Sequence, residues 1–297
     1  MAPDYLRFER IAAHIGAALR CSLAPRPAAP VRGGCIGDSH RWSSSHGTLF
    51  VKLAPAAQLP MLEGEAFGLD ELARADAVRV PGVRAVGATD DDAYLALEWL
   101  ELRAPSPATE AELGRRLARQ HRVTAAQFGW HRSNHIGATP QVNVPCTDWA
   151  VFFREQRLRP QLDLAARNGH GADLQRAGGR LLGRIDALLA GHRPPPALLH
   201  GDLWDGNRAA TADGPVIFDP AVYYGDREAD LAMTRLFGGF GPAFHAAYDA
   251  SWPPEPGAAA RATLYNLYHV LNHLNLFGGH YREEATSMID ALLAPAG

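Results

Sequence analysis

The chain has 297 residues, enough for one large domain or for two lobes with a sizeable core. Its formal net charge of −3 gives no reason to expect a nucleic acid or an anionic membrane as a partner. No apolar run approaches the roughly 18 residues that cross a bilayer, no signal-peptide pattern opens the chain, and three cysteines without a C-x-x-C make no disulfide framework. We therefore expect a globular protein of a reducing cytoplasm.

Only one of the 29 basic residues is a lysine, Lys52. A coding bias towards arginine is the simplest cause of this scarcity. Under such a bias, the one retained lysine marks a position where arginine would not serve. A compact ammonium on a flexible stem is suited to act as a point charge on nucleotide phosphates.

The first half of the chain begins with a predicted helix over 5–20, whose apolar residues share one face. After a proline-rich break, a glycine-rich turn over 31–40 precedes a strand over 48–53. This pair predicts a hairpin with Lys52 on its second strand. In the small lobe of kinases, a glycine-rich loop covers the nucleotide and a strand lysine reaches the phosphates.

The glycine-rich turn matches the kinase pattern G-x-G-x-x-G only in part. Gly34 and Gly37 occupy two of its glycine positions, whereas Arg32 occupies the third. An ordinary hairpin turn is the alternative reading of these glycines. The chain contains no G-x-x-x-x-G-K-[ST], which argues against a P-loop NTPase.

A helix predicted over 60–75 carries two candidate partners for Lys52, Glu63 and Glu65. Kinases pair the strand lysine with a glutamate of the small-lobe helix. A solvated helix face is the alternative explanation for both glutamates.

Two further strands are predicted over 83–86 and 93–97, separated by an acidic turn. The next residues form a natural hinge whose backbone groups would hold an adenine edge: Glu98, Trp99 and Leu100. We place the boundary between two lobes near residue 102.

The remainder of the chain is predicted to be mainly helical. The expected helices cover approximately 108–123, 147–167, 172–190, 227–237, 241–250, 257–276 and 281–293. His269 and His273 lie four residues apart, as in some metal sites, but without H-E-x-x-H and a third ligand we expect packed or hydrogen-bonded histidines. His121, His131 and His135 are interpreted in the same way.

Two short strands in the second half run into polar loops that carry the predicted chemistry. The first strand leads through His-Gly-Asp to Asp202, with Asn207 five residues later, and the second ends at Asp219. Kinase-type phosphoryl transfer uses an Asp to orient the substrate hydroxyl and an Asn plus a later Asp to hold Mg²⁺. One Asp and one Asn in a turn are common by themselves, but the added strand ending in Asp219 favours a kinase.

Together these features predict an α+β protein with a protein-kinase-like, two-lobe fold. Residues 1–102 would form a small β-rich nucleotide-binding lobe, and residues 103–297 a larger, mainly helical lobe for catalysis and substrate. The expected cofactors are ATP and Mg²⁺.

Several longer stretches resemble the fructosamine kinase, or ketosamine-3-kinase, family. The segments that carry the resemblance are 199–207, 218–221, 223–232 and 236–240, together with 129–137, 140–143, 148–149, 158–162 and 271–277. The resemblance extends from the Gly34 turn to about residue 292. The His-Gly-Asp and Asp219 pieces are shared with aminoglycoside and choline kinases, whereas the Leu-Trp after Asp202 and the Phe-Gly-Gly-Phe ending at Phe240 are particular to ketosamine kinases.

The resemblance implies phosphorylation of the 3-hydroxyl of a ketosamine, free or protein-bound. The 3-phosphate would then eliminate and release the amine, which reverses glycation. Ribulosamines, erythrulosamines and fructosamines all remain open as substrates. Another small-molecule kinase of the aminoglycoside or choline type is the alternative, and a pseudokinase is disfavoured because the key residues are intact.

The resemblance also implies roles for individual residues. Asp202 would be the catalytic base, Asn207 and Asp219 the magnesium ligands, and Lys52 the phosphate lysine with Glu65 as its partner. The remaining assignments are an aromatic wall against the sugar at Trp204 and possible substrate contacts at Asn134, Gln141 and Asn143.

Cys35 lies in the glycine-rich loop, where backbone amides and a nearby cation would favour the reactive thiolate. Some ketosamine kinases carry a cysteine in this loop, which implies redox control. We expect either a monomer or a homodimer linked through Cys35. A small apolar residue packed under the loop is the equally weighted alternative.

Overall fold

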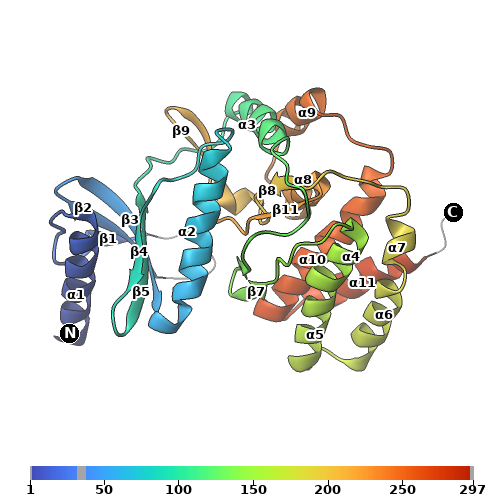
Figure 1. Cartoon of the computed structure of the whole chain (residues 1–297), viewed down its shortest axis with the longest axis horizontal. Helices are drawn as coiled ribbons and strands as arrows, with labels where there is room; N and C mark the ends of the chain where they lie inside the picture. The colour runs from blue at the N-terminus through green and yellow to red at the C-terminus, as the bar shows by residue number, and fades with distance from the viewer. Residues whose placement is uncertain (1, 32–37, 295–297) are drawn as a thin grey trace.

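The computed structural model describes residues 2–31 and 38–294, which form two lobes (Figure 1). One lobe is built on a five-stranded antiparallel sheet and the other is mainly helical, so the predicted α+β fold is confirmed. Gly34, Cys35 and Gly37 lie outside the described residues, and their predicted roles stay predictions.

The sheet of the N-terminal lobe has the strand order β1-β2-β3-β5-β4. Its elements are α1 (Ala2–Leu19), β1 (Ala29–Pro30), β2 (Asp38–Ser44), β3 (Gly47–Pro55), a 3₁₀ turn (Ala56–Gln58), α2 (Leu59–Arg74), β4 (Val83–Ala88) and β5 (Asp92–Glu98). Figure 1 shows α1 and α2 on opposite sides of this sheet.

Strand alternation determines which side chains face each helix. Val51 and Leu53 of β3 belong to a buried apolar cluster that packs on α1. Because successive residues of a strand point to opposite faces, Lys52 faces the α2 side. The same alternation places Tyr94 of β5 in the α1 cluster and Leu95 in the cluster that contains α2.

The predicted hairpin differs from the observed one. The segment 31–37 connects β1 to β2, and a tight turn with Gly47 at φ +111° connects β2 to β3. Lys52 therefore lies on the third strand of the sheet, one strand further from the glycine-rich segment than predicted. Strand β2 was not predicted, because its mainly polar residues give no continuous apolar pattern.

The C-terminal lobe combines nine α-helices and one π-helical turn with short strands, among the described residues. Its elements are α3 (Pro107–Gln120), β6 (Asn134–Ile136), β7 (Thr139–Gln141), α4 (Trp149–Phe153), the π-helical turn (Arg154–Leu158), α5 (Arg159–Arg167), α6 (Ala172–Leu182), α7 (Ile185–Leu188), β8 (Ala197–Leu199), a 3₁₀ turn (Asp205–Asn207), β9 (Arg208–Thr211), β10 (Gly214–Ile217), β11 (Tyr223–Gly225), α8 (Arg227–Leu236), α9 (Pro242–Ser251), α10 (Ala258–Phe277) and α11 (Tyr281–Leu293).

Most predicted helices are confirmed, and two are divided. The helix predicted over 147–167 contains the π-helical turn at Arg154–Leu158. The helix predicted over 172–190 ends at Leu182, and a separate short helix follows from Ile185. Gly183 stands at this interruption, and glycine is a weak helix former. The β6–β7 hairpin was not predicted.

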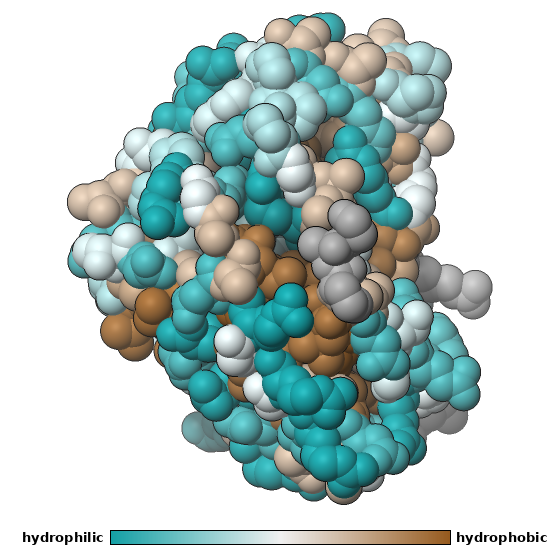
Figure 2. All heavy atoms as spheres, turned by 90° about the vertical axis from the view of Figure 1, so that its right-hand side faces the viewer, coloured by the Kyte–Doolittle hydropathy of each residue, from teal (hydrophilic) through white to brown (hydrophobic). Residues whose placement is uncertain are grey.

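Helix α2 of the N-terminal lobe also packs against the helical lobe. Its buried residues Leu62 and Leu69 belong to the same apolar cluster as Phe152 and Leu271 of the helical lobe. No helix of the described residues is long and apolar enough to cross a membrane. The face of the helical lobe seen in Figure 2 is mainly hydrophilic and has an apolar area near its middle.

Candidate active site

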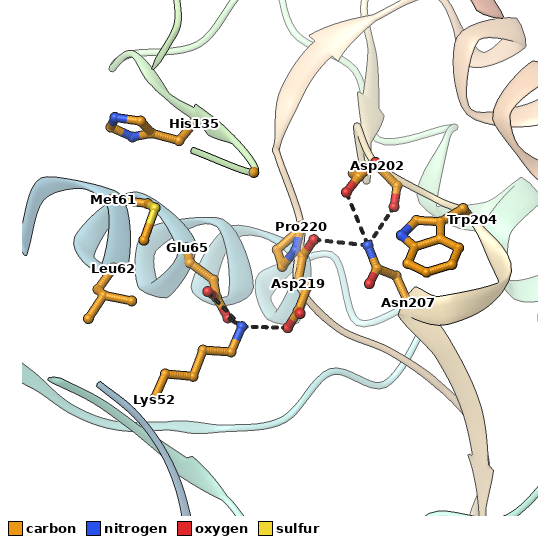
Figure 3. A pocket seen from close by; sticks show the side chains of 11 residues that line it. Lys52, Met61, Leu62, Glu65, His135, Asp202, Trp204, Asn207, Asp219 and Pro220 are labelled. Carbon is orange, nitrogen blue, oxygen red and sulfur yellow. Dashed lines mark hydrogen bonds and ion pairs between the residues drawn. The ribbon is translucent and has the colours of Figure 1, made fainter. Parts of the chain in front are cut away.

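Lys52 is the centre of a buried ion cluster between the lobes (Figure 3). Its Nζ donates to Glu65 Oε1 at 2.8 Å, to Glu65 Oε2 at 2.9 Å and to Asp219 Oδ1 at 2.7 Å. The three ammonium hydrogens thus match three carboxylate oxygens. Burial alone would lower the pKa of Lys52, but the carboxylates of Asp219 and Glu65 outweigh it and raise that pKa, so the lysine stays charged.

Glu65 rather than Glu63 makes this pair. Glu65 lies on α2 opposite β3, and its carboxylate remains largely covered in the ion cluster. The sequence pattern left both glutamates open, the family resemblance favoured Glu65, and the 2.8 Å distance from Lys52 Nζ to Glu65 Oε1 agrees with that preference.

Asp219 follows β10 in an unusual backbone conformation. Its φ of +57° lies in the left-handed region, which aspartate tolerates better than most residues but still at a cost. Neighbouring bonds hold the segment: His200 Nε2 lies 3.0 Å from Phe218 O, and Phe218 N donates to Asn207 O at 3.1 Å. The strained conformation directs the carboxylate towards Lys52.

Asp202 and Asn207 belong to the loop that follows β8. Asn207 Nδ2 donates to Asp202 O at 2.9 Å, to Asp202 Oδ2 at 3.2 Å and to Asp219 O at 3.4 Å. Burial and the negative charge of Asp219 raise the pKa of Asp202 to about 7. A carboxylate with this pKa is a better proton acceptor than an exposed aspartate.

Asp230 of α8 holds the loop that carries Asp202. Its carboxylate accepts hydrogen bonds from His200 N at 2.7 Å and Gly201 N at 2.9 Å, and it lies 3.1 Å from His121 Nε2. Gly201 has φ +83°, and an added Cβ would lie 2.1 Å from Ala221 O, so a larger residue cannot make this turn. These bonds hold the backbone of the two residues that directly precede Asp202.

A cavity of about 480 Å³ lies on the hinge side of Lys52. Glu98, Trp99 and Leu100 line it, as the prediction of a nucleotide pocket requires, together with Phe50 and Phe218. Its volume falls in the ordinary range of ligand pockets, about 300–1,000 Å³. The side chain of Glu98 is engaged with Arg79 at 3.0 Å, so the hinge backbone rather than this carboxylate is available to a base.

A second cavity, of about 100 Å³, lies on the other side of Lys52. We call it the acceptor cavity. It is lined by Lys52, Met61, Leu62, Glu65, His135, Gly137, Asp202, Trp204, Asn207, Asp219 and Pro220. Because Lys52 and Asp219 line both cavities, the two spaces meet at the ion cluster.

The side chains of this junction suit a magnesium ion. Asp219 supplies carboxylate oxygens, and Asn207 uses its amide nitrogen on Asp202 and Asp219, which leaves Oδ1 for a cation. Oxygen ligands of this kind are what Mg²⁺ prefers. The donor set therefore fits the predicted metal.

Trp204 closes one end of the acceptor cavity. An added Cβ on Gly206 would lie 2.2 Å from the Trp204 ring, so this glycine allows the indole to fold over the loop. The ring also meets Phe237 at 6.5 Å between centroids, and Phe237 is exposed at the surface. The Trp204 end of the cavity therefore has an exposed aromatic side chain next to it.

Asn134 and Gln141 occupy a different place from the one predicted. Both are buried, and neither lines the acceptor cavity. Asn134 Nδ2 donates to Val222 O at 2.8 Å, and Gln141 Nε2 donates to Ala221 O at 3.0 Å. They hold the segment after Asp219 in position instead of facing a substrate, because their polar groups are used within the protein.

Asn143, the third expected contact on this loop, is buried as well. Its Nδ2 donates to Asn134 Oδ1 at 2.9 Å, and its Oδ1 accepts from Arg157 at 2.7 Å. The cavity residues that were not predicted as site residues are Met61, Leu62, Gly137, Pro220 and His135, the last of which was interpreted as a packed histidine.

His121 and His269 are buried as expected, whereas His131 is exposed. His269 is buried in α10, and His273 Nδ1 lies 2.8 Å from His269 O, so the two rings do not form a metal pair.

The known proteins that are similar to this chain have related descriptions. The family model described as fructosamine kinase matches residues 7–295. A probable ketoamine kinase of Synechocystis is 46% identical over 89% of both chains. A chloroplastic protein-ribulosamine 3-kinase of Arabidopsis thaliana is 40% identical over 89% of this chain and 81% of its own.

Solved structures agree with the sequence relatives. A protein of Thermobifida fusca assigned as a fructosamine-3-kinase has a TM-score of 0.84 and 36% identity, covering 96% of this chain and 99% of its own. A second, from Haemophilus somnus, has a TM-score of 0.88 and 25% identity, covering 98% and 99%. An aminoglycoside phosphotransferase in complex with ADP and hygromycin B shares the fold at a TM-score of 0.64 and 14% identity.

Proposed function

Because the chain belongs to the fructosamine kinase family, we propose that it transfers the γ-phosphoryl group of ATP to the 3-hydroxyl of a ketosamine. One observation carries this proposal. A nucleotide-sized cavity and an acceptor cavity meet at Lys52 and Asp219, and Asp202 lies at the same junction. The names of the relatives, ketoamine kinase and protein-ribulosamine 3-kinase, support a ketosamine as the acceptor.

The proposed roles follow from the contacts of each side chain. Lys52, oriented by Glu65, steadies the nucleotide phosphates. Asp219 and Asn207 hold Mg²⁺, which when bound offsets the charge of the phosphate oxygens. Asp202 accepts the proton of the 3-hydroxyl.

The transfer itself is a single displacement. The substrate oxygen forms a bond to the γ-phosphorus while the bond from that phosphorus to the bridging oxygen breaks, and ADP leaves with the electron pair. The hydroxyl proton passes to Asp202, whose raised pKa suits this role at neutral pH. Elimination of inorganic phosphate from C3 of the product, followed by hydrolysis of the resulting imine by water, would release the amine, so we propose a role in reversing glycation.

The decisive experiment is ATP turnover with ribuloselysine and fructoselysine in parallel, next to choline and an aminoglycoside panel. We expect ADP formation with at least one ketosamine and a product phosphate on C3 by NMR. The Asp202→Asn variant serves as the background control. Turnover restricted to choline or aminoglycosides, or a phosphate at another carbon, would contradict the proposal.

A further inference from the structure

The β6–β7 hairpin brings one unassigned side chain, His135, to the acceptor cavity. The hairpin pairs Asn134 with Gln141 and Ile136 with Thr139. Asn134 and Ile136 are buried, at 3% and 2% exposure. Since alternate residues of a strand point in opposite directions, His135 faces away from that buried side.

The hairpin is firmly attached on its buried side. Asn134 and Gln141 donate to the carbonyls of Val222 and Ala221, and Tyr268 Oη donates to Gln141 Oε1 at 2.8 Å. Helix α2 also approaches closely, because an added Cβ on Gly64 would lie 3.2 Å from Asn134 Cβ. His135 is therefore presented from a fixed support, as a selective binding site requires.

The ring nitrogens of His135 have no protein partner in the ranges 2–31 and 38–294. Nδ1 is buried without a hydrogen bond. Burial also lowers the pKa of His135, so the imidazole is neutral at physiological pH. A neutral imidazole both donates and accepts hydrogen bonds, which suits an uncharged hydroxyl better than an ammonium or a phosphate.

The two ends of the acceptor cavity differ in chemistry. Figure 3 shows His135 beside Met61 at one end and Trp204 at the other, with Asp202 near Trp204. A ketosamine has a cationic amine on C1 and only hydroxyl groups beyond C3. The indole face attracts a cation, and Phe237 beside the indole is exposed at the surface. The labelled cavity residue nearest His135 in Figure 3 is Met61, which is uncharged.

We infer that His135 binds a ketose hydroxyl beyond C3 and so makes the site selective for sugar length. This inference rests on the proposed function. It also implies one orientation of the substrate in the cavity. With the 3-hydroxyl at Asp202, the amine and its carrier leave past Trp204, and the sugar tail extends to the β6–β7 hairpin. A protein-bound amine then stays outside while the sugar is enclosed.

The test compares the KM for erythrulosyl-, ribulosyl- and fructosyl-lysine across variants of position 135. His135→Ala and His135→Phe both remove the hydrogen bond, but phenylalanine keeps an aromatic ring at this position. We expect each to raise the KM for the longer sugars by about threefold to tenfold, the value of one hydrogen bond. The KM for ATP and for the shortest sugar should change less than twofold, and His135→Gln should restore part of the loss.

His131→Ala is the matched control, since His131 is exposed on the same segment and does not line the cavity. A His135→Phe variant with wild-type KM values for all three sugars would reduce His135 to a packing residue. An equal rise of the KM for ATP and for every sugar would overturn the inference by indicating a disturbed hairpin. A wild-type protein that phosphorylates no ketosamine would instead refute the proposed function, and the inference with it.

Discussion

Replacing Lys52 by arginine keeps the charge and is nevertheless expected to inactivate the protein. Lys52 Nζ makes three contacts of 2.7–2.9 Å to two carboxylates, with its side chain only 10% exposed. A guanidinium is longer, planar and unable to place three donors around one point. Asp219 cannot move aside easily, because its backbone is held in the left-handed region by the bonds around Phe218.

The magnitude follows from the contacts that are lost. A hydrogen bond to a charged group contributes about 1.5–3 kcal/mol, and we expect Lys52→Arg to lose two of the three. At about 1.5 kcal/mol each, the loss is about 3 kcal/mol, which corresponds to roughly a hundredfold in kcat/KM. In the proposed function Lys52 steadies the nucleotide phosphates, so the KM for ATP should rise while the KM for the acceptor changes little.

The assay measures ADP release at varied ATP with a saturating acceptor. Thermal unfolding serves to separate a loss of function from a loss of fold. Arg180→Lys is the control, because it introduces a lysine at an exposed site and should leave the rate unchanged. Amine labelling identifies the Lys52→Arg protein, since it contains no lysine side chain. A Lys52→Arg rate within threefold of wild type would refute the reasoning from the single lysine.

Three further outcomes are expected. Asp202→Asn should bind ATP normally but turn over at least roughly a hundredfold more slowly, because it loses the proton acceptor. Nucleotide titration and initial rates measure the two effects, and a rate within threefold of wild type would contradict the prediction. Asp219→Asn should shift the magnesium dependence of the rate to higher concentration, since an amide oxygen is a poorer ligand, and an unchanged titration would exclude Asp219 as a ligand. Burial lowers the pKa of His269 to about 3, so the stability that its neutral ring supports is complete above about pH 6.5 and declines as the pH falls towards 3. Urea unfolding measures the free energy of unfolding at pH 7 and pH 5. Between these pH values wild type should lose up to about 2 kcal/mol more of this free energy than His269→Leu does, and equal losses would refute the lowered pKa of His269.

The ion cluster was predictable because its residues carry local signals. Lys52 is marked by lysine scarcity and by a strand whose alternation turns it towards α2. Asp202 and Asn207 are marked by their spacing, and Asp219 by the end of a strand. The choice of Glu65 over Glu63 required the family resemblance, since the helical pattern alone leaves both on partly solvated positions.

The acceptor cavity was less predictable because tertiary contacts decide which polar side chains face it. Asn134 and Gln141 bond to carbonyls more than 75 residues later in the chain, and no local pattern reports such partners. The two strands that carry them have three residues each, too few for a periodic signal. A polar loop was therefore predicted where the buried side of the β6–β7 hairpin lies.

The same short strand explains how this part of the chain combines support with recognition. A strand that buries Asn134 and Ile136 must turn the residue between them to the opposite side, whatever its chemistry. The fold thereby fixes the position of residue 135 through its neighbours and leaves its identity free to vary with the substrate. Selectivity for the sugar can then change by one substitution at His135 without disturbing the carbonyl contacts that hold the segment after Asp219.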